Sequence, residues 1–396
     1  MLTNEIIRLQ AEAQQDYVIE SRRTIHRFAE VSGKEFKTSA FIEEEIKKAG
    51  LPYEKAGDTG WIAILDTGKP GSRIALRADI DALLVPEEPN NLAGPRVVVS
   101  DDPHTSHACG HDAHTAMLLG AMRVLAEQRD NLTGVIYFCF EEGEEDGRGI
   151  LAMLNQLSAH GVDVCWGIHV YAGLESGKIC VSAGPRMAGA AGVGIKVIGR
   201  GGHGSQPQNT TDPVLAAAQM IVMMQQIVAR RVDPMEMAVF SLGSIHGGDA
   251  PNVIPAEVKF GGVTRAYSES VRSVIKEQVQ AIAKGIEAAS GNTVHIHYAD
   301  GYPSAFNDKE LMDLAAEAVR KELGEDAVVP MPDPMPFSED FSFYGKLGGI
   351  PSAYLMLYAG HEGELAPLHN PKCAVREDVM PAGIRTLVSI ALEFLK

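Results

Sequence analysis

The sequence is poor in cysteine, and it lacks both a secretion signal and a long apolar run. Its five cysteines are scattered without regular spacing, which excludes a disulfide-stapled scaffold and favours a reducing compartment. The N-terminus has no basic stretch followed by an apolar one, so no signal peptide is expected. No uninterrupted apolar run reaches membrane-spanning length. We therefore expect a cytoplasmic protein.

Positive charge is also scarce. The chain has 35 Lys and Arg against 52 Asp and Glu, which gives a net charge of −17. Such an acidic chain is repelled by the phosphates of nucleic acids and by anionic lipid surfaces. The composition therefore predicts neither nucleic acid nor membrane as a partner.

The length of 396 residues exceeds what one hydrophobic core usually supports, so two domains are expected. Helical patterns in the first part alternate with apolar runs at 135–140 and 164–170, which are typical of strands buried on both faces. The pattern changes near Gly184, and residues 192–299 follow the order β-α-β-β-α-β of a ferredoxin-like unit.

We therefore predict an α/β protein with two domains. The larger domain has a helix-layered mixed sheet and is formed by residues 1–184 and 304–396. The smaller domain, residues 185–303, is an inserted ferredoxin-like α+β unit.

What the sequence does contain is one segment with a thiol and three imidazoles, His107-Ala108-Cys109-Gly110-His111-Asp112-Ala113-His114-Thr115. Thiolate sulfur and imidazole nitrogen are ligands that transition metals prefer. A buried structural cysteine with a capping histidine is the alternative, but the segment is polar, contains glycine and precedes a helix. We predict that Cys109 and His111 bind metal and that His107 and His114 support the site.

A pair of carboxylates, Glu141 and Glu142, follows the first buried strand directly. Adjacent side chains point to different sides, so one carboxylate can bind metal while the other faces an activated water. An acidic surface loop is the alternative, and Glu144 and Glu145 form a competing pair further into that loop. The position at a strand end favours Glu141 and Glu142.

Other polar side chains are expected at the same edge of the sheet. His169 ends the second buried strand, and Asp79 and Asp81 follow a third strand. Ligands of open α/β sheets bind outside the carboxyl ends of the strands. His169 therefore becomes a candidate ligand, although a satisfied core histidine is an equally good interpretation of a lone His.

The segment Gly199–Gly204 matches the G-x-G-x-x-G pattern of dinucleotide sites, but a phosphate-binding turn should open a helix directly. Here residues 205–212 intervene, and we reject a dinucleotide site. His203 in this glycine loop is free to reach a ligand instead. Arg265, at a strand end, is a candidate for binding a substrate carboxylate, with an exposed structural role as the alternative.

Taken together, these segments resemble the metal-dependent aminoacylase-type amidohydrolases, in particular the hippurate hydrolase and indole-acetyl-amino-acid hydrolase branch. The resemblance runs nearly end to end. It is carried by Leu76–Leu83, His107–Thr115, Glu141–Gly143, Gly167–Val170, Gly201–His203, Asn252–Pro255, Ser338–Phe341 and Leu368–Asn370.

The resemblance implies a site with two divalent metal ions. Thiolate, imidazole and carboxylate ligands are compatible with zinc, manganese, cobalt or nickel. Glu141 would be the general base and acid, and Asp81 a supporting carboxylate behind the ligands. Cys109 would be shared by both ions. The implied ligands are Cys109, His111, Glu142, His169 and His369.

The inserted domain resembles the lid and dimerisation domain of the same family. The resemblance implies a homodimer in which His203 reaches the active site of the partner subunit and stabilises the oxyanion. Asn252 and Arg265 match positions associated with substrate contacts. Members of the branch commonly read F-Q-P-A-E-E before the base, whereas Tyr137–Glu142 lacks the proline and the glutamine.

The sequence therefore predicts a dimetal amidohydrolase that cleaves the amide bond of N-acyl amino acids or small peptide-like substrates. One alternative is a dipeptidase or carboxypeptidase acting on short peptides. Another is a non-catalytic, metal-dependent binding protein, against which the retained pair of Glu141 and Glu142 speaks.

Overall fold

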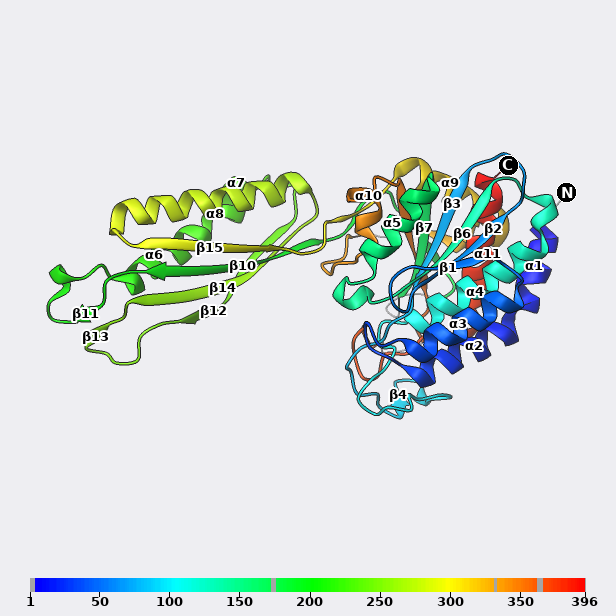
Figure 1. Cartoon of the computed structure of the whole chain (residues 1–396), viewed down its shortest axis with the longest axis horizontal. Helices are drawn as coiled ribbons and strands as arrows, with labels where there is room; N and C mark the ends of the chain where they lie inside the picture. Colours follow the sequence, from blue (N-terminus) through cyan, green and yellow to red (C-terminus); the bar gives the residue numbers. More distant parts are fainter. Residues whose placement is uncertain (1–3, 172–175, 331–332, 362–365, 396) are drawn as a thin grey trace. The chain divides into compact units, whose positions relative to one another are not determined.

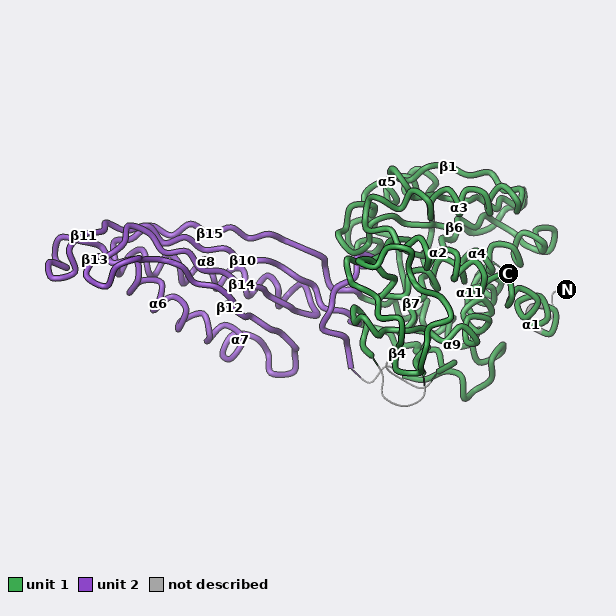
Figure 2. The backbone as a smooth tube through the Cα atoms, turned by 90° about the horizontal axis from the view of Figure 1, so that it is seen from below, with its two compact units in different colours: residues 1–184, 306–332, 343–396 green, residues 185–305, 333–342 purple. Residues whose placement is uncertain are grey.

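The chain folds into two compact units, coloured separately in Figure 2. The structure is a computed structural model that describes residues 4–171, 176–330, 333–361 and 366–395. Unit 1 combines Met1–Gly184, Phe306–Pro332 and Phe343–Lys396, so both ends of the chain contribute to it. Unit 2 combines Pro185–Ala305 and Asp333–Ser342.

Unit 1 is built on an eight-stranded sheet with the order β1-β2-β6-β3-β7-β18-β8-β17. β3 runs parallel to β6 and to β7, β18 runs parallel to β7, and β2 runs antiparallel to β6. This large mixed sheet confirms the predicted mixed α/β class. The strands are β1 (Tyr53–Lys55), β2 (Trp61–Asp66), β3 (Arg73–Asp79), β6 (Val135–Glu141), β7 (Val164–Tyr171), β8 (Ile179–Cys180), β17 (Val328–Val329) and β18 (Ser352–Tyr358).

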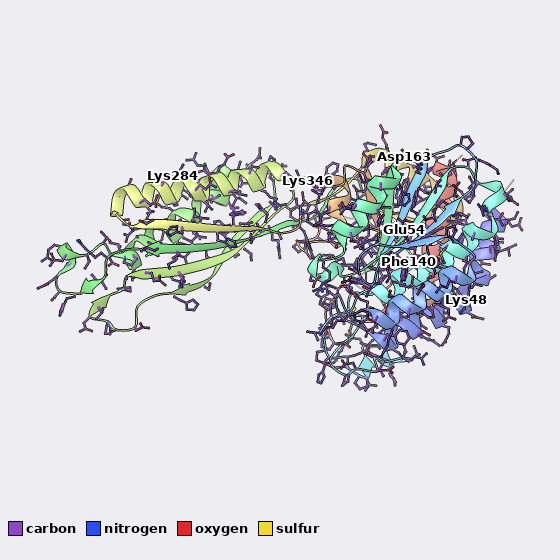
Figure 3. The ribbon with its side chains drawn as sticks, in the orientation of Figure 1. Lys48, Glu54, Phe140, Asp163, Lys284 and Lys346 are labelled. Atoms are coloured by element: carbon purple, nitrogen blue, oxygen red, sulfur yellow. The ribbon has the colours of Figure 1, made fainter. Side chains whose placement is uncertain are left out.

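Helices surround this sheet, as Figure 1 shows. They are α1 (Asn4–Ala13), α2 (Gln15–Phe28), α3 (Phe36–Lys48), α4 (His111–Glu127), α5 (Ile150–His160), α9 (Lys309–Leu323), α10 (Ser342–Lys346) and α11 (Met380–Phe394). One continuous hydrophobic core joins α4 and α11 to the central strands. Phe140, labelled in Figure 3, is fully buried at the end of β6, as the apolar run predicts for a central strand.

α4 begins at His111, three residues earlier than the helical pattern from His114 suggests. Gly110 precedes it with a left-handed backbone (φ 90°), a conformation that glycine adopts without the steric cost of a side chain. The tight turn brings His111 and Asp112 into the first helical turn. This start brings the segment of residues 107–115 to the end of β7, where the backbone N–H of Val170 donates to His114 Nε2.

Unit 2 contains a four-stranded antiparallel sheet in the order β12-β14-β10-β15. Asp212 and Ser268 cap its two long helical segments by accepting hydrogen bonds from backbone N–H groups, as expected from their positions. The elements are β10 (Gly189–Ile198), α6 (Pro213–Met224), α7 (Gln226–Arg231), β12 (Ala238–His246), β14 (Glu257–Ala266), α8 (Glu269–Ser290) and β15 (Thr293–Asp300), with a short ribbon of β11 (Gly202–His203) and β13 (Val253–Ile254).

The remaining elements are short. They are the hairpin β4 (Asn90–Asn91) and β5 (Gly94–Pro95), the strands β9 (Gly184–Met187) and β16 (Ala305–Asn307), and the 3-10 turns η1 (Arg129–Asn131), η2 (Glu144–Asp146), η3 (Pro207–Asn209), η4 (Glu325–Ala327) and η5 (Glu377–Val379).

Candidate metal centre

Three predicted ligands meet where α4 approaches the end of β7. The ligand atoms of Cys109, His111 and His169 all lie within 4.8 Å of one another, and all three residues are buried. Cys109 Sγ lies 3.5 Å from His169 Nε2. The Gly110 turn supplies the first two side chains, and the strand end supplies the third. The structure therefore brings together side chains that are 60 residues apart in sequence.

The two histidines are oriented by their other ring nitrogens. His111 Nδ1 lies 3.0 Å from Asp81 Oδ1, and His169 Nδ1 contacts the carbonyl oxygen of Val170. These acceptors hold the hydrogen on Nδ1 and leave the Nε2 lone pairs for a metal, as is usual for histidine ligands. Although burial opposes it, the hydrogen bond with His111 holds the pKa of Asp81 below its usual value. Asp81 thus lies beside His111, and its supporting role stays a prediction.

His114 cannot contribute a ligand atom in the same way. Its Nδ1 lies 2.6 Å from Asp79 Oδ1, and its Nε2 accepts a hydrogen bond from the backbone N–H of Val170 at 2.8 Å. Burial lowers the pKa of His114, so the ring is neutral and both nitrogens are engaged. His114 also forms a candidate group with Asp79 and His111, but both of its ring nitrogens already have partners, which favours the predicted supporting role.

His107 is buried beside this cluster but belongs to none of the candidate ligand groups found among the described residues. Its ring centroid lies 6.1 Å from that of His26, and burial lowers its pKa to about 4. His107 is therefore a neutral side chain behind the site.

The structure does not bring Glu141 and Glu142 to this cluster. Glu141 Oε2 accepts hydrogen bonds from Arg77 Nε at 2.9 Å and from the Tyr344 hydroxyl at 2.6 Å. Glu142 Oε2 accepts from the Thr59 hydroxyl at 2.8 Å and from the backbone N–H groups of Thr59 and Gly60. In the described parts of the chain neither carboxylate belongs to a candidate metal group. Their predicted roles as base and ligand therefore need correction.

The competing pair, Glu144 and Glu145, lies at this cluster instead. Glu144 and Glu145 lie in η2, and both form a candidate group with His111. Glu145 Oε1 lies 3.8 Å from His111 Nε2 and 3.4 Å from His369 Nε2. The backbone N–H of Glu145 donates to Asp81 Oδ2 at 3.1 Å, which fixes the turn.

A sequence signal for this register exists. If the motif F-Q-P-A-E-E begins at Phe140, its two glutamates fall on Glu144 and Glu145, whereas a start at Tyr137 places them on Glu141 and Glu142. The phenylalanine therefore favours the later pair. In this register Glu141 and Glu142 replace the glutamine and the proline.

His369 comes from a loop near the C-terminal end of the chain. It forms a candidate group with Cys109 and Glu145, and its backbone N–H donates to the carbonyl oxygen of Ala108 at 2.9 Å. Its backbone is left-handed (φ 63°), which is uncommon for a residue with a side chain and marks a constrained position. Cys109 is thus common to two ligand groups, one with His111 and His169 and one with Glu145 and His369.

A cation fits these residues. His111 Nε2 and Glu145 Oε1, which lie 3.8 Å apart, are two of the buried side-chain atoms that have no hydrogen-bond partner in the described chain. Buried polar atoms are normally satisfied, and two such atoms that face each other are what a divalent ion would satisfy. A thiol, imidazoles and a carboxylate also form the mixed soft and hard ligand set of a transition metal.

The three remaining predicted residues lie in unit 2. His203 is exposed in β11, and the backbone N–H of the neighbouring Gly204 donates to the carbonyl oxygen of Asn252 at 2.8 Å. The structure therefore places His203 and Asn252 on the same small ribbon. Arg265 lies on β14, in register with Ala190 and Val239, and is not part of that ribbon.

A thiol, three imidazoles and paired carboxylates at the end of a mixed α/β sheet define a metal-dependent hydrolase. The sequence agrees, because residues 75–393 match the model of Peptidase family M20/M25/M40. The chain therefore belongs to this family, which confirms the resemblance. The protein is an enzyme that acts on amide bonds.

Three relatives illustrate the match. The chain is 35% identical to thermostable carboxypeptidase 1 of Saccharolobus solfataricus over 96% of each chain. It is 38% identical to an N-acyl-L-amino acid amidohydrolase of Geobacillus stearothermophilus over 78% of this chain and 83% of that protein. The crystal structure of Bacillus subtilis YXEP protein, a dinuclear metal-binding peptidase of the M20 family, is 28% identical with a TM-score of 0.83 and covers 97% of this chain and 99% of the other.

Proposed function

We propose that the protein is a dimetal amidohydrolase that cleaves the amide bond of N-acyl amino acids. The observation that carries this proposal is the pair of ligand groups that share Cys109, with Glu144 beside them. The names of relatives support the substrate class, since they include an N-acyl-L-amino acid amidohydrolase and an N-acetyl-L-cysteine deacetylase.

We assign the two divalent ions, whose identity among zinc, manganese, cobalt and nickel is open, to five ligands. They are Cys109, His111, Glu145, His169 and His369, with Glu145 in place of Glu142. When bound, the ions would polarise the scissile carbonyl and lower the pKa of a water molecule toward 7.

Glu144 takes the role of general base and acid in place of Glu141. Its side chain is buried next to Glu145 in η2, on the side where His111 contributes to the same group. A carboxylate in this position accepts the proton of the attacking water and then delivers it to the leaving nitrogen. The products are a carboxylate and a free amino acid.

Unit 2 acts in this proposal as the lid and dimerisation domain, inserted at residues 185–303 between the two parts of the catalytic domain. The surface of α6 favours the dimerisation role, because its apolar side chains Leu215 and Val222 are 57% and 72% exposed. A symmetric dimer of a cytoplasmic enzyme would cover them. We further propose that Asn252 and Arg265 bind the substrate and that His203 stabilises the oxyanion in the partner's site.

This cross-subunit role of His203 predicts complementation. His203→Ala should lower kcat by roughly 100- to 1,000-fold because one oxyanion donor is lost. A mixed dimer of His203→Ala and Glu144→Gln chains, isolated with two affinity tags, should recover about half of the wild-type activity because one site is complete. Mixed dimers no more active than their parents would contradict the role.

The substrate class is tested with metal-reconstituted enzyme and a panel of N-acyl amino acids, dipeptides and longer peptides, scored by amine release. We expect the highest kcat/KM with N-acyl amino acids. A preference for peptides would favour the second candidate, a carboxypeptidase or dipeptidase, which the relationship to thermostable carboxypeptidase 1 supports. No release from any substrate would leave the binding-protein alternative.

A further inference from the structure

One of the proposed ligands, His369, sits on an irregular loop, and its side chain is 52% exposed. A half-exposed side chain on a loop is free to move unless the loop is held by other contacts. The loop is not held by strand pairing, because residues 368–373 lie outside every strand and helix of the described chain. The contacts that fix its backbone therefore decide whether His369 reaches the metal.

The His369 N–H is bonded directly to the carbonyl oxygen of Ala108, and Arg96 supplies further contacts to the same loop. Its Nη2 donates to the carbonyl oxygens of Pro371 at 2.9 Å and of Cys373 at 2.8 Å. Its Nε donates to the carbonyl oxygen of Glu88 at 2.7 Å, and the backbone N–H of Glu88 donates to Pro371 at 3.1 Å. One guanidinium thus joins the loop of residues 87–102 to the loop that follows His369. Its hydrogen bonds come from a charged donor and are therefore stronger than hydrogen bonds between neutral groups.

The guanidinium is itself fixed by buried charge. Arg96 Nη1 lies 3.2 Å from Glu87 Oε1, and both side chains are 4% exposed. The same Glu87 oxygen lies 2.8 Å from His26 Nε2, and His26 Nδ1 lies 2.8 Å from Asp112 Oδ2. The contacts therefore reach Asp112, the residue next to the proposed ligand His111.

We propose that Arg96 is a positioning residue for the metal site, which holds the His369 loop against the segment that carries Cys109 and His111. This inference rests on the proposed function, because it takes His369 as a ligand. It predicts that Arg96 affects the ion bound by Cys109, Glu145 and His369 more than the ion bound by Cys109, His111 and His169.

The test is a cobalt titration of metal-free Arg96→Met, followed by visible absorption and by metal analysis of the gel-filtered protein. We expect one equivalent to bind as in the wild type and the second to bind roughly 10- to 100-fold more weakly, the usual effect of losing a residue that supports a ligand. Arg96→Lys, which keeps the charge near Glu87, should fall between the two and serves as the test protein if Arg96→Met does not fold.

The matched control is Arg385→Met. Arg385 also binds a carboxylate and a carbonyl oxygen, both from Glu322, but it joins α11 to α9. It should bind two equivalents with wild-type affinity. Two equivalents bound with wild-type affinity by the folded Arg96 variants would overturn the proposal.

His369→Ala separates this failure from a failure of the proposed function. It should bind a single equivalent of cobalt. If His369→Ala binds two equivalents as tightly as the wild type does, the ligand assignment is wrong; if only the Arg96 variants do so, the ligand assignment stands and the positioning role is wrong.

Discussion

Replacement of Glu144 by glutamine should lower kcat about 1,000-fold and leave both metal equivalents in place. General acid–base catalysis by a positioned side chain typically contributes 100- to 10,000-fold, and the amide cannot accept the proton of the attacking water. Glutamine has the same shape as glutamate, and Glu145 remains to bind metal. The measurement is steady-state hydrolysis of an N-acyl amino acid together with metal analysis of the same preparation.

Glu141→Gln is the matched control, because it makes the same carboxylate-to-amide change three residues away. Glu141 is bonded to Arg77 and Tyr344, so its loss should affect stability instead of turnover. Removing one partner of a buried ion pair costs about 3–5 kcal/mol, and the isosteric amide should bring the loss toward the lower end. Chemical denaturation measures this. Loss of turnover in Glu141→Gln with full activity in Glu144→Gln would return the base to Glu141.

The position at a strand end did not identify which of the two carboxylate pairs lies at the metal site. A strand end points to a functional edge, but the last residue of a strand is still part of the sheet. Glu141 is in register with Asp79 of β3, and both carboxylates bind the same buried guanidinium of Arg77. The position at the strand end therefore pointed to carboxylates that neutralise the buried charge of Arg77 within the sheet.

The chain reaches the site only after a further turn. Gly143 adopts a left-handed backbone (φ 62°), and η2 then returns Glu144 and Glu145 toward His111. A short 3-10 turn leaves no periodic pattern in a sequence, so only the motif register that starts at Phe140 could have revealed it.

Other parts were predictable for clear physical reasons. Cys109 and His111 stand close together in a polar segment, and His169 lies near the end of an apolar run that is typical of a buried strand. His369 carries no such signal, because tertiary contacts alone bring its loop to Ala108 and Arg96. It was predicted solely from the resemblance. The supporting position of His114 likewise depends on a hydrogen bond from the backbone N–H of Val170. The spacing of residues in the sequence does not reveal this bond.

Cys109→Ala should have the largest effect on metal binding, because Cys109 is the residue that the two ligand groups have in common. Replacement of any other member of the two ligand groups should affect mainly one ion, as we expect for His369→Ala. Loss of the shared thiolate removes a ligand from both ions at once, and we expect affinity to fall at least about 100-fold at each. Metal analysis after gel filtration should find less than one equivalent.

The matched control for this change is Cys139→Ala. Cys139 is another buried thiol, lies in β6 and belongs to no candidate metal group of the described chain. The variant should keep two equivalents and lose only about 1 kcal/mol of stability through a small cavity. A second measurement follows from linkage, because bound ions stabilise the folded state. Chelation should lower the Tm of the wild type and of Cys139→Ala but not that of Cys109→Ala. Two tightly bound equivalents in Cys109→Ala, with a normal chelator response, would mean that the ions do not share this thiolate and that the two ligand groups describe a different centre.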